Sequence, residues 1–364
     1  MTSYNSGHSS SNTGGDIAGT FCTDVAIIGG GPVGMFAVFQ AGMLGFKSCV
    51  IDILGEAGGQ CSALYPEKPI YDIPGFAKVT GQQLVDNISE QIKPFNPHYF
   101  LNSRVTSIER ISGDDNGYNF DVRISGNSGN LVRCKAVIIA TGGGAFLPNK
   151  PPISNIDTFE NSSVFYSVKS VDALKGKRVV IAGGGDSAVD WALNLAGVAE
   201  KIYLVHRRNK FRSAVASIEK VRKIAETSGD IEFVIPYQLS ALEGDGGVLK
   251  SVEVADIDGN RKILPADVLL AFFGLSMNNS DLLNWNIGLH KDLKHVDVDV
   301  FTMSTSEDGI YAIGDIAWYR NKQKLILTGF SEAALACNSI YKFIYPDKEL
   351  HFEYSTTKGV KSIQ

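Results

Sequence analysis

Apolar runs that end at glycine clusters divide the chain into repeating units. An apolar run from Thr23 to Ile28 is followed by clustered glycines and by a second apolar stretch, from about Val33 to Leu44, that is long enough for a helix. The next run, Phe46 to Ile53, contains Asp52 near its end and predicts another strand. A strand, a glycine turn, a helix and a strand in this order are typical of the start of a parallel sheet.

The same order returns in the middle of the chain. The sequence predicts a strand from Lys177 to Ala182, a turn at Gly183 to Gly185, a helix from Ser187 to Val198 and a strand from Lys201 to Val205. The predicted fold class is therefore α/β, with two Rossmann-like dinucleotide-binding units.

Shorter strands lie between and after these units. Asn-Gly and Ser-Gly turns separate three stretches that predict a β-meander, and a buried strand then runs into Thr141 and the glycines after it. A late strand ends at Gly314 and Asp315, and a helix follows. The predicted bounds are Arg104–Arg110, Asn119–Ile124 and Leu131–Cys134 for the meander, Ala136–Ala140 for the buried strand, Gly309–Ile313 for the late strand and Ser331–Ile344 for the helix.

Length and composition narrow the class of protein. The 364 residues suggest two domains and allow three, and an apolar content of 44% excludes a wholly disordered or fibrous chain. A net charge of −5 gives no reason to expect a nucleic-acid partner. Five cysteines, an odd number without a CxxC pair, favour a reducing compartment with neither a disulfide framework nor a zinc site, and no metal ligand is predicted.

Two stretches bear on location. No charge occurs between Val25 and Phe46, but the glycines and Pro32 in that stretch make a membrane-spanning helix a poor interpretation. Residues 1–20 carry Asp16 and neither Lys nor Arg, so the positive start of a secretory signal is missing. We therefore expect a cytoplasmic protein that does not bind a membrane, with a disordered tail at residues 1–20.

The first glycine turn fits a dinucleotide. In the pattern Gly29-x-Gly31-x-x-Gly34, the first glycine allows a tight turn, the second lets the backbone approach a pyrophosphate, and the third lets the helix pack on the strand. Asp52 follows at the end of the next strand and can accept hydrogen bonds from ribose hydroxyls. The competing interpretation is a generic glycine-rich turn with a solvated aspartate, but the strand and helix around the pattern favour the dinucleotide.

The second glycine turn carries the opposite charge. Where the first unit has an acid, arginines follow the second strand, and arginines favour the 2′-phosphate of NADP over the free hydroxyl of NAD. The competing interpretation is a solvated basic helix face, which applies above all to Lys220, Arg222 and Lys223. The predicted NADP residues are Gly183, Gly185 and Ala188 in the turn, and His206, Arg207, Arg208 and Arg212 after the strand.

Several motifs together resemble one group of flavoproteins. The two glycine turns, Gly58-Gly59-Gln60, His206-Arg207-Arg208 and Gly314-Asp315 are similar to those of thioredoxin-reductase-type flavoproteins, from about residue 21 to the C-terminus. A closer resemblance is to ferredoxin–NADP reductases of the thioredoxin-reductase type. It rests on Gln60 to Lys68, Gly143 to Phe146, Asp186 to Ala192 and the tail beyond Tyr354.

One feature of the sequence distinguishes between these two families. Thioredoxin reductases place a CxxC dithiol just before the second glycine turn, whereas residues 162–176 of this chain contain no cysteine. Without a dithiol, electrons cannot pass to a protein disulfide by thiolate exchange. Cys61, which lies beside Gln60 without a resolving partner nearby in the sequence, is expected to be a plain buried thiol.

The resemblance implies a site for flavin adenine dinucleotide (FAD). It places the first glycine turn at the pyrophosphate, Asp52 at the adenosine ribose, and the rings of Tyr65 and Tyr354 on the two flavin faces. Alternatively, Tyr65 and Phe146 are core aromatics and Tyr354 is an exposed tyrosine. No acid–base residue is expected, because hydride transfer from a nicotinamide to a flavin needs none. The implied FAD residues are Gly29, Gly31, Gly34, Asp52, Gln60, Tyr65, Val105, Phe146, Asp315 and Thr356.

The resemblance also implies an architecture and an activity. It implies a three-layer ββα arrangement, with an FAD domain at residues 21–155 and 278–364 and an NADP domain inserted at 156–277. The implied enzyme is a ferredoxin–NADP reductase, in which NADPH gives a hydride to flavin N5 and single electrons then pass to a 2Fe-2S or 4Fe-4S protein. A homodimer is implied as well.

Two alternatives stay open. The first is the same flavoenzyme with another acceptor, such as flavodoxin, a quinone or oxygen. The second is a non-catalytic binding protein that senses FAD and NADP. A small acidic ferredoxin would suit the basic stretch after the second turn by electrostatic steering.

Overall fold

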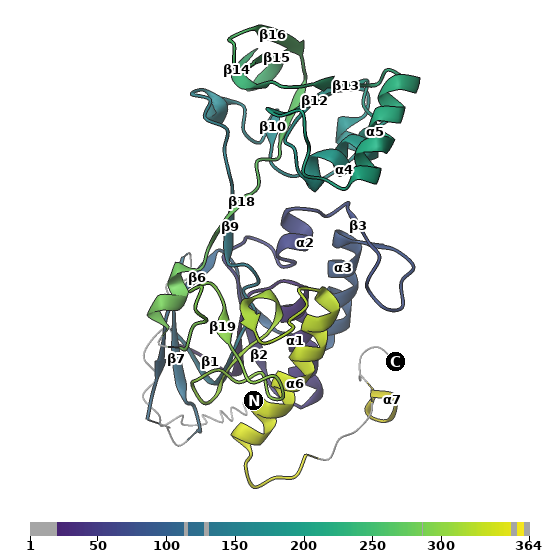
Figure 1. The fold of residues 1–364 in the computed structure, drawn as a ribbon. Helices are drawn as coiled ribbons and strands as arrows, with labels where there is room; N and C mark the ends of the chain where they lie inside the picture. Colours follow the sequence, from purple (N-terminus) through teal and green to yellow (C-terminus); the bar gives the residue numbers. More distant parts are fainter. Residues whose placement is uncertain (1–19, 113–115, 127–130, 286, 351–354, 360–364) are drawn as a thin grey trace, which may run out of the picture.

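The computed structural model describes residues 20–112, 116–126, 131–285, 287–350 and 355–359. Figure 1 shows two lobes joined by an extended strand pair. We call the lower lobe, residues 20–148 and 275–350, the split half, and the upper lobe, residues 149–274, the inserted half. The predicted tail lies outside the described residues except for Thr20, which opens the first strand.

A mixed sheet forms the centre of the split half. Its first strand runs parallel to a neighbour on either side, so that Val25 lies opposite both Ser48 and Ala136. The strand order is β5 (His98–Phe100), β2 (Ser48–Ile51), β1 (Thr20–Ile28), β8 (Leu131–Ile139), β7 (Phe120–Gly126) and β6 (Ser103–Arg110), with β20 (Ile310–Ala312) also pairing β8.

β8 is one strand where the sequence analysis predicted two, and that part of the prediction is wrong. The register of β8 against β1 is the same on both sides of Lys135, whose ammonium forms a 2.9 Å salt bridge with Asp24 on β1. The start of β8 also pairs with antiparallel β7, and its end pairs with parallel β20. This change of neighbour explains why a half-exposed start leads into a fully buried end.

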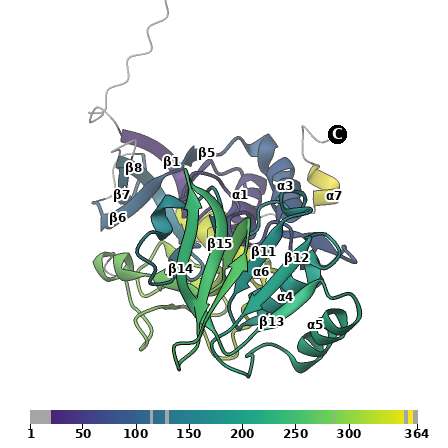
Figure 2. The ribbon, with the colours of Figure 1, turned by 90° about the horizontal axis from the view of Figure 1, so that it is seen from above.

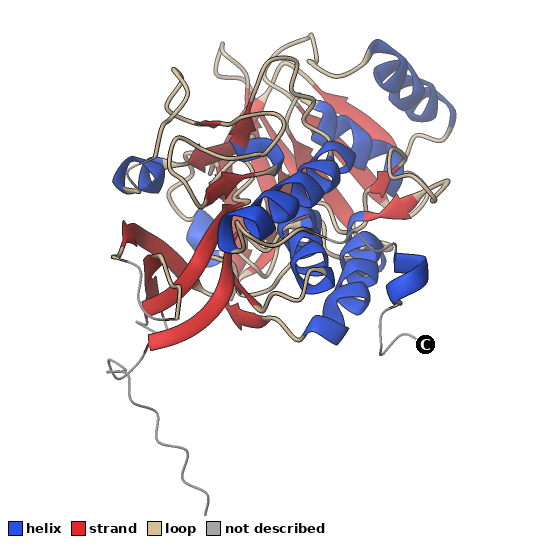
Figure 3. Ribbon diagram, turned by 90° about the horizontal axis from the view of Figure 1, so that it is seen from below, coloured by secondary structure: helices blue, strands red, loops and turns tan. Residues whose placement is uncertain are grey.

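Alternate side chains of β1 enter two different cores. Val25 and Ile27 pack with residues of α1 (Pro32–Met43), α3 (Gly81–Ile92) and α6 (Ile326–Ile344), whereas Ala26 and Ile28 pack with β6 and β7. Figure 3 shows these long helices, in blue, gathered beside the red sheet. Because the period of a strand is two residues, one short run of apolar residues supplies both cores.

α6 begins earlier than the predicted start at Ser331. Its first residue is Ile326, and Gly329 lies within its first turns. A Cβ atom at Gly329 would lie 2.3 Å from Cγ2 of Val33, so the glycine lets α6 pack closely against α1. Tertiary packing therefore outweighs the low helix propensity of glycine at this position.

The inserted half has three layers. α4 (Asp186–Leu195) and α5 (Val215–Thr227) pack on one face of a parallel sheet, and a small antiparallel sheet packs on the other (Figure 2). The parallel sheet has the order β10 (Val164–Phe165), β17 (Val268–Ala271), β11 (Arg178–Ala182), β12 (Lys201–Val205) and β13 (Ile231–Val234). The small sheet consists of β14 (Gln238–Asp245), β15 (Val248–Ala255) and β16 (Arg261–Pro265). The predicted α/β class with two Rossmann-like units is confirmed.

The chain crosses between the halves twice, side by side. β9 (Ala145–Pro148) leads upward and β18 (Leu275–Asn278) leads back, as an antiparallel pair (Figure 1). A salt bridge between Lys68 Nζ and Asp190 Oδ2, at 2.8 Å, also links the halves. The remaining α-helices and strands of the described residues are α2 (Gln60–Ala63), β3 (Pro69–Ile70), β4 (Val79–Thr80), β19 (Val296–Asp297), β21 (Ala317–Trp318) and α7 (Ser355–Lys358).

Candidate functional site

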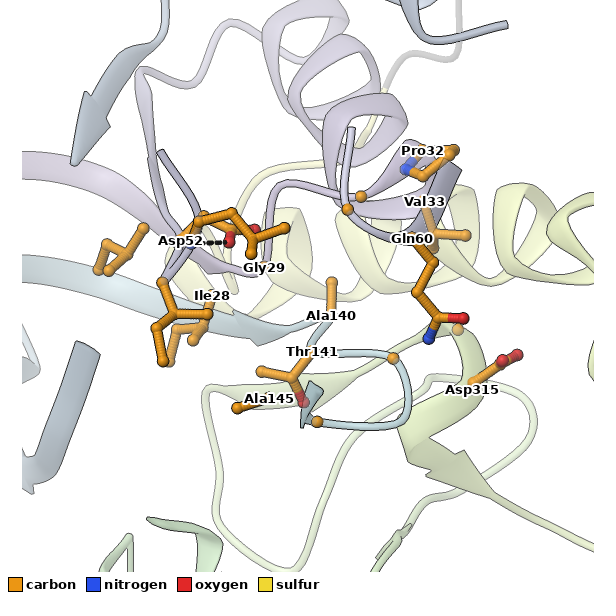
Figure 4. Close-up of a pocket in the computed structure, with 18 of the residues that line it drawn as sticks. Ile28, Gly29, Pro32, Val33, Asp52, Gln60, Ala140, Thr141, Ala145 and Asp315 are labelled. Atoms are coloured by element: carbon orange, nitrogen blue, oxygen red, sulfur yellow. Dashed lines mark hydrogen bonds between the residues drawn. The ribbon is translucent and has the colours of Figure 1, made fainter. Parts of the chain in front are cut away.

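A pocket opens at the carboxyl edge of the first sheet, where β1, β2 and β8 end (Figure 4). In the close-up, Asp52, Thr141, Gln60 and Asp315 surround it from different elements. Seven of the ten residues expected to bind FAD line this pocket. They are Gly29, Gly31, Asp52, Gln60, Tyr65, Val105 and Asp315.

The first glycine turn has the shape that the pattern requires. Gly29 has a φ of +109°, and a Cβ atom on it would lie 2.3 Å from the carbonyl oxygen of Ala140. A Cβ atom on Gly34 would lie 2.0 Å from the carbonyl oxygen of Gly29, so this glycine packs the helix and does not line the pocket. Gly31 is the N-cap of α1 and has open space on its side-chain side, since the nearest atom to a Cβ placed on it would be the Cα of Gly59, at 4.0 Å.

Asp52 is buried at the end of β2, with 7% of its surface exposed. Burial raises the pKa of Asp52, although hydrogen bonds from two backbone N–H groups partly oppose the shift. The donors are Leu54 N to Oδ1 at 2.8 Å and Gly30 N to Oδ2 at 2.5 Å. A carboxylate has about four lone-pair sites, so this one keeps capacity for further donors.

Two buried polar atoms in the pocket wall lack a partner. Thr141 Oγ1 and Trp285 Nε1 form no hydrogen bond within the described part of the chain, and both residues line the pocket. A buried polar atom without a partner costs about 1–3 kcal/mol. An acceptor-rich and donor-rich ligand such as FAD would satisfy both atoms, and the open face at Gly31 leaves space for its phosphates. The residues present therefore fit the cofactor.

Tyr65 and Cys61 form a neutral pair at the pocket. The Cys61 thiol donates to the phenolic oxygen of Tyr65 at 3.6 Å, and burial raises the pKa of both groups. Cys61 is 1% exposed, which agrees with the expectation of a plain buried thiol. Among the described residues no two cysteines form a disulfide, and no group of side chains is arranged to hold a metal ion.

A buried carboxylate that the sequence analysis missed supports the Gly314-Asp315 turn. Glu332 on α6 accepts from Gly314 N at 2.8 Å through Oε2, and from Tyr319 OH at 2.7 Å through Oε1. The Lys322 ammonium also contacts Oε1, and the two charged side chains are 5% and 3% exposed. The available signal was a single acid in the otherwise uncharged first turns of a helix.

The second glycine turn is covered by His206. A Cβ atom on Gly184 would lie 2.2 Å from the imidazole, so only glycine lets this ring pack against the turn. Burial lowers the pKa of His206, and the nearby arginines lower it further. Arg212 N donates to the carbonyl oxygen of Gly184 at 2.7 Å, which draws the arginine segment against the turn. Gly185 begins α4 and faces open space.

The cations around the second turn point to solvent. Arg207, Arg208 and Arg212 are exposed, and none of them forms an ion pair with a carboxylate of the described residues. The next residue, Ser213, has a buried hydroxyl without a hydrogen-bond partner in the described chain. Unpaired cations and an unsatisfied hydroxyl beside a helix start fit the phosphates of NADP(H), and the sequence analysis did not identify Ser213.

Three more residues are assigned to the flavin by the resemblance alone. Tyr354 and the side chain of Phe146 lie outside the described residues. Thr356 lies on α7, is exposed, and is not among the residues that line the pocket. Their assignment to FAD stays a prediction.

Known proteins match nearly the whole chain. The model of a family described as pyridine nucleotide-disulphide oxidoreductase matches residues 23–334. A ferredoxin–NADP reductase of Acidiphilium cryptum is 53% identical over 345 residues, which cover 94% of this chain and 99% of that protein. A ferredoxin–NADP reductase of Rickettsia canadensis is 51% identical over 340 residues, which cover 93% of this chain and 98% of that protein.

Solved structures agree in fold. A thioredoxin reductase of T. acidophilum superimposes with a TM-score of 0.68 at 23% identity, over 88% of this chain and 98% of that one. The thioredoxin reductase of Lactococcus lactis, in a form described as the FR conformation, gives a TM-score of 0.66 at 24% identity, over 89% and 99%. At these identities the likeness concerns the fold alone. Within the described residues, none of the helices is both long enough and apolar enough to cross a membrane.

The Glu332 cluster yields a stability prediction. Glu332→Gln leaves the buried Lys322 ammonium without a counter-charge, so we expect the free energy of unfolding in urea to fall by about 3 kcal/mol. Adding Lys322→Met removes the stranded charge and recovers most of this loss. The control is Glu90→Gln, which breaks an exposed pair of 3.4 Å with Lys93 and costs less than about 1 kcal/mol. Equal losses for the two single variants would contradict the buried pair.

Proposed function

We propose a path for electrons through this chain from the premise that it belongs to the pyridine nucleotide-disulphide oxidoreductase family. It is an FAD- and NADP(H)-dependent oxidoreductase of the ferredoxin–NADP reductase type. The observation that carries the proposal is the opposite chemistry of the two glycine turns. One has a buried aspartate and unsatisfied polar atoms around a pocket, and the other has exposed unpaired arginines.

The split half is proposed to hold FAD. The proposed FAD domain comprises residues 21–155 and 278–364. Gly31 would face the pyrophosphate, Asp52 the adenosine ribose, and Asp315 the ribityl chain, while Tyr65 would cover one flavin face beside Gln60. When bound, FAD accepts a hydride at N5 from NADPH and passes single electrons to an iron–sulfur protein.

The inserted half is proposed to hold NADP(H), as a domain of residues 156–277. Gly183 and Gly185 would place backbone at the pyrophosphate, and α4 would point its N–H groups toward it. Arg207, Arg208 and Arg212 would bind the 2′-phosphate, and His206, which packs on Gly184, would orient the arginine segment. The chain contributes position and the exclusion of water, because hydride transfer requires no acid or base from the protein.

The electron acceptor follows from the name of the relatives and from charge. The curated relatives are ferredoxin–NADP reductases, and the sequence has no CxxC pair that could reduce a protein disulfide. Lys220, Arg222 and Lys223 on α5 are exposed, and none has a carboxylate partner among the described residues. We propose that this basic face steers an acidic ferredoxin. A homodimer in the cytoplasm, without a membrane or nucleic-acid partner, completes the proposal.

The first test measures the colour of the purified protein and its rate with different electron acceptors. The purified full-length protein should be yellow, bleach on anaerobic titration with NADPH, and regain its colour when ferredoxin is added. The control acceptor is an artificial dye. Turnover with ferredoxin no faster than with the dye would favour flavodoxin, a quinone or oxygen as acceptor. A colourless protein that takes up no FAD would overturn the proposal.

The second test concerns the choice of nucleotide. Arg207→Ala with Arg208→Ala removes charge-assisted hydrogen bonds to the 2′-phosphate, so the ratio of kcat/KM for NADPH over NADH should fall about 100-fold. The value for NADH itself should change little. Lys220→Ala with Lys223→Ala removes the same charge from α5 and should leave the ratio unchanged. Equal ratios in the two double variants would refute the phosphate assignment.

The third test concerns steering. The rate of ferredoxin reduction at limiting ferredoxin should fall about tenfold as ionic strength rises from roughly 0.02 to 0.5 M, because salt screens exposed charges. In the triple variant Lys220→Gln, Arg222→Gln and Lys223→Gln, the low-salt rate should be lower and the salt dependence weaker. Reduction of an uncharged dye serves as the control. A wild-type rate that does not change with salt would remove α5 as the docking face.

A further inference from the structure

The FAD pocket contains a cation that the proposed cofactor contacts do not use. The charged residues in its wall are Asp52, Arg104, Asp281, Asp315 and Lys324. Arg104 forms a 2.7 Å salt bridge with Asp281 across the wall. Lys324 is exposed and has no carboxylate partner among the described residues, so no ion pair cancels its positive charge at the wall of the pocket.

Lys324 lies on the side of the pocket where Asp315 and the start of α6 meet. The next two residues, Leu325 and Ile326, also line the pocket, and Ile326 is the first residue of α6. The helix has neither a side-chain cap nor an acid in its first turn, so its N-terminal N–H groups are not neutralised by its own sequence. The helix end and the lysine therefore both contribute positive potential to this part of the wall, opposite in sign to that of Asp315.

Two side chains, His295 and Asp292, are hydrogen-bonded in series to Lys324, and we call this series the relay. Its ammonium lies 3.0 Å from Nε2 of His295, and Nδ1 of the same ring lies 2.6 Å from Oδ2 of Asp292. A lysine ammonium can only donate, so Nε2 must accept and Nδ1 must donate its hydrogen to Asp292. The relay fixes one tautomer of a neutral imidazole and points the ring at the lysine.

Asp292, the last residue of this relay, is held in place by backbone hydrogen bonds. Oδ1 of Asp292 accepts from Lys294 N at 2.9 Å and from His295 N at 3.2 Å. The Asn279 side chain donates to the carbonyl oxygen of Lys294 at 2.8 Å and lies against Gly144 in the pocket wall. The loop that carries His295 is thus attached to the pocket wall, where His295 positions the charged Lys324.

We propose that Lys324, positioned by His295 and Asp292, sets the reduction potential of the bound flavin. A fixed positive charge stabilises the negative charge that FAD gains on reduction more than it stabilises the oxidised form, and such charges tune a flavin's electronics. Lys324 is a cofactor-contacting residue, and His295 is a positioning residue that acts through it. The inference rests on the proposed FAD site and adds a determinant of potential to it.

The experiment measures the flavin potential of FAD-loaded, full-length protein by spectroelectrochemical titration. Lys324→Met should weaken the preference for reduced over oxidised FAD about tenfold, which lowers the potential by about 30 mV for a two-electron couple. Lys324→Arg keeps the charge and should stay close to the wild type. His295→Phe keeps a ring without the acceptor nitrogen and should fall between them. Affinity of the apoprotein for oxidised FAD should change less than threefold in all of them.

The matched control is Lys291→Met. Lys291 is an exposed lysine of the loop that carries His295, and it does not line the FAD pocket. Its loss therefore removes an equal charge without a change at the wall. A potential of Lys324→Met equal to that of Lys291→Met would overturn the inference. If the wild type binds FAD and bleaches with NADPH, that result leaves the proposed function standing. A wild type that takes up no FAD would overturn both.

Discussion

The site depends on backbone contacts too close to admit a side chain. Gly34 meets the carbonyl oxygen of Gly29, and Gly29 meets that of Ala140, so helix α1, the end of β1 and the end of β8 converge. Hydrogen bonds from Gly29 N to Ile51 O, at 2.8 Å, and from Ala140 N to Ile28 O, at 2.7 Å, join the same strand ends. Asp52, Thr141 and the start of α1 are brought to one edge by this convergence, and the pocket exists because of it.

The two dinucleotide units show how one scaffold is given two specificities. Both have a glycine turn that opens a helix, and both place a strand end next to that turn. Asp52 at the first strand end is buried and accepts backbone hydrogen bonds, whereas Arg207 and Arg208 at the second are exposed. A carboxylate suits neutral hydroxyls, and guanidinium groups suit a phosphate. In the proposed function, the shared scaffold places each nucleotide, and the residues at the strand end choose between the two nucleotides.

Local sequence patterns predicted most helices and strands, but they could not predict contacts between elements that are distant in the sequence. The strand Lys201–Val205 was predicted with its observed bounds. The turn at Gly29 to Gly34 has the expected geometry, and it was predictable because the glycines that it requires are visible in the sequence. Lys324 and Trp285 line a pocket whose other walls come largely from residues more than 100 positions earlier in the chain, and they reach it through the segments before α6 and after β18. No spacing rule encodes such approaches. The break assumed within β8 failed for the same reason, since a strand that changes neighbours looks locally like two strands.

The insertion of one half within the other has a consequence for synthesis on the ribosome. All strands of the inserted half, from Val164 to Ala271, emerge before β20 and α6 of the split half exist. Domains fold as units during translation, in general the N-terminal one first. Here the half that starts first must wait until β20 and α6 are made, because before then β8 lacks a neighbouring strand and β1 lacks a covering helix. The nascent chain can complete the inserted half early, whereas the pocket of the split half is complete only after Asp315 and Lys324 have been made.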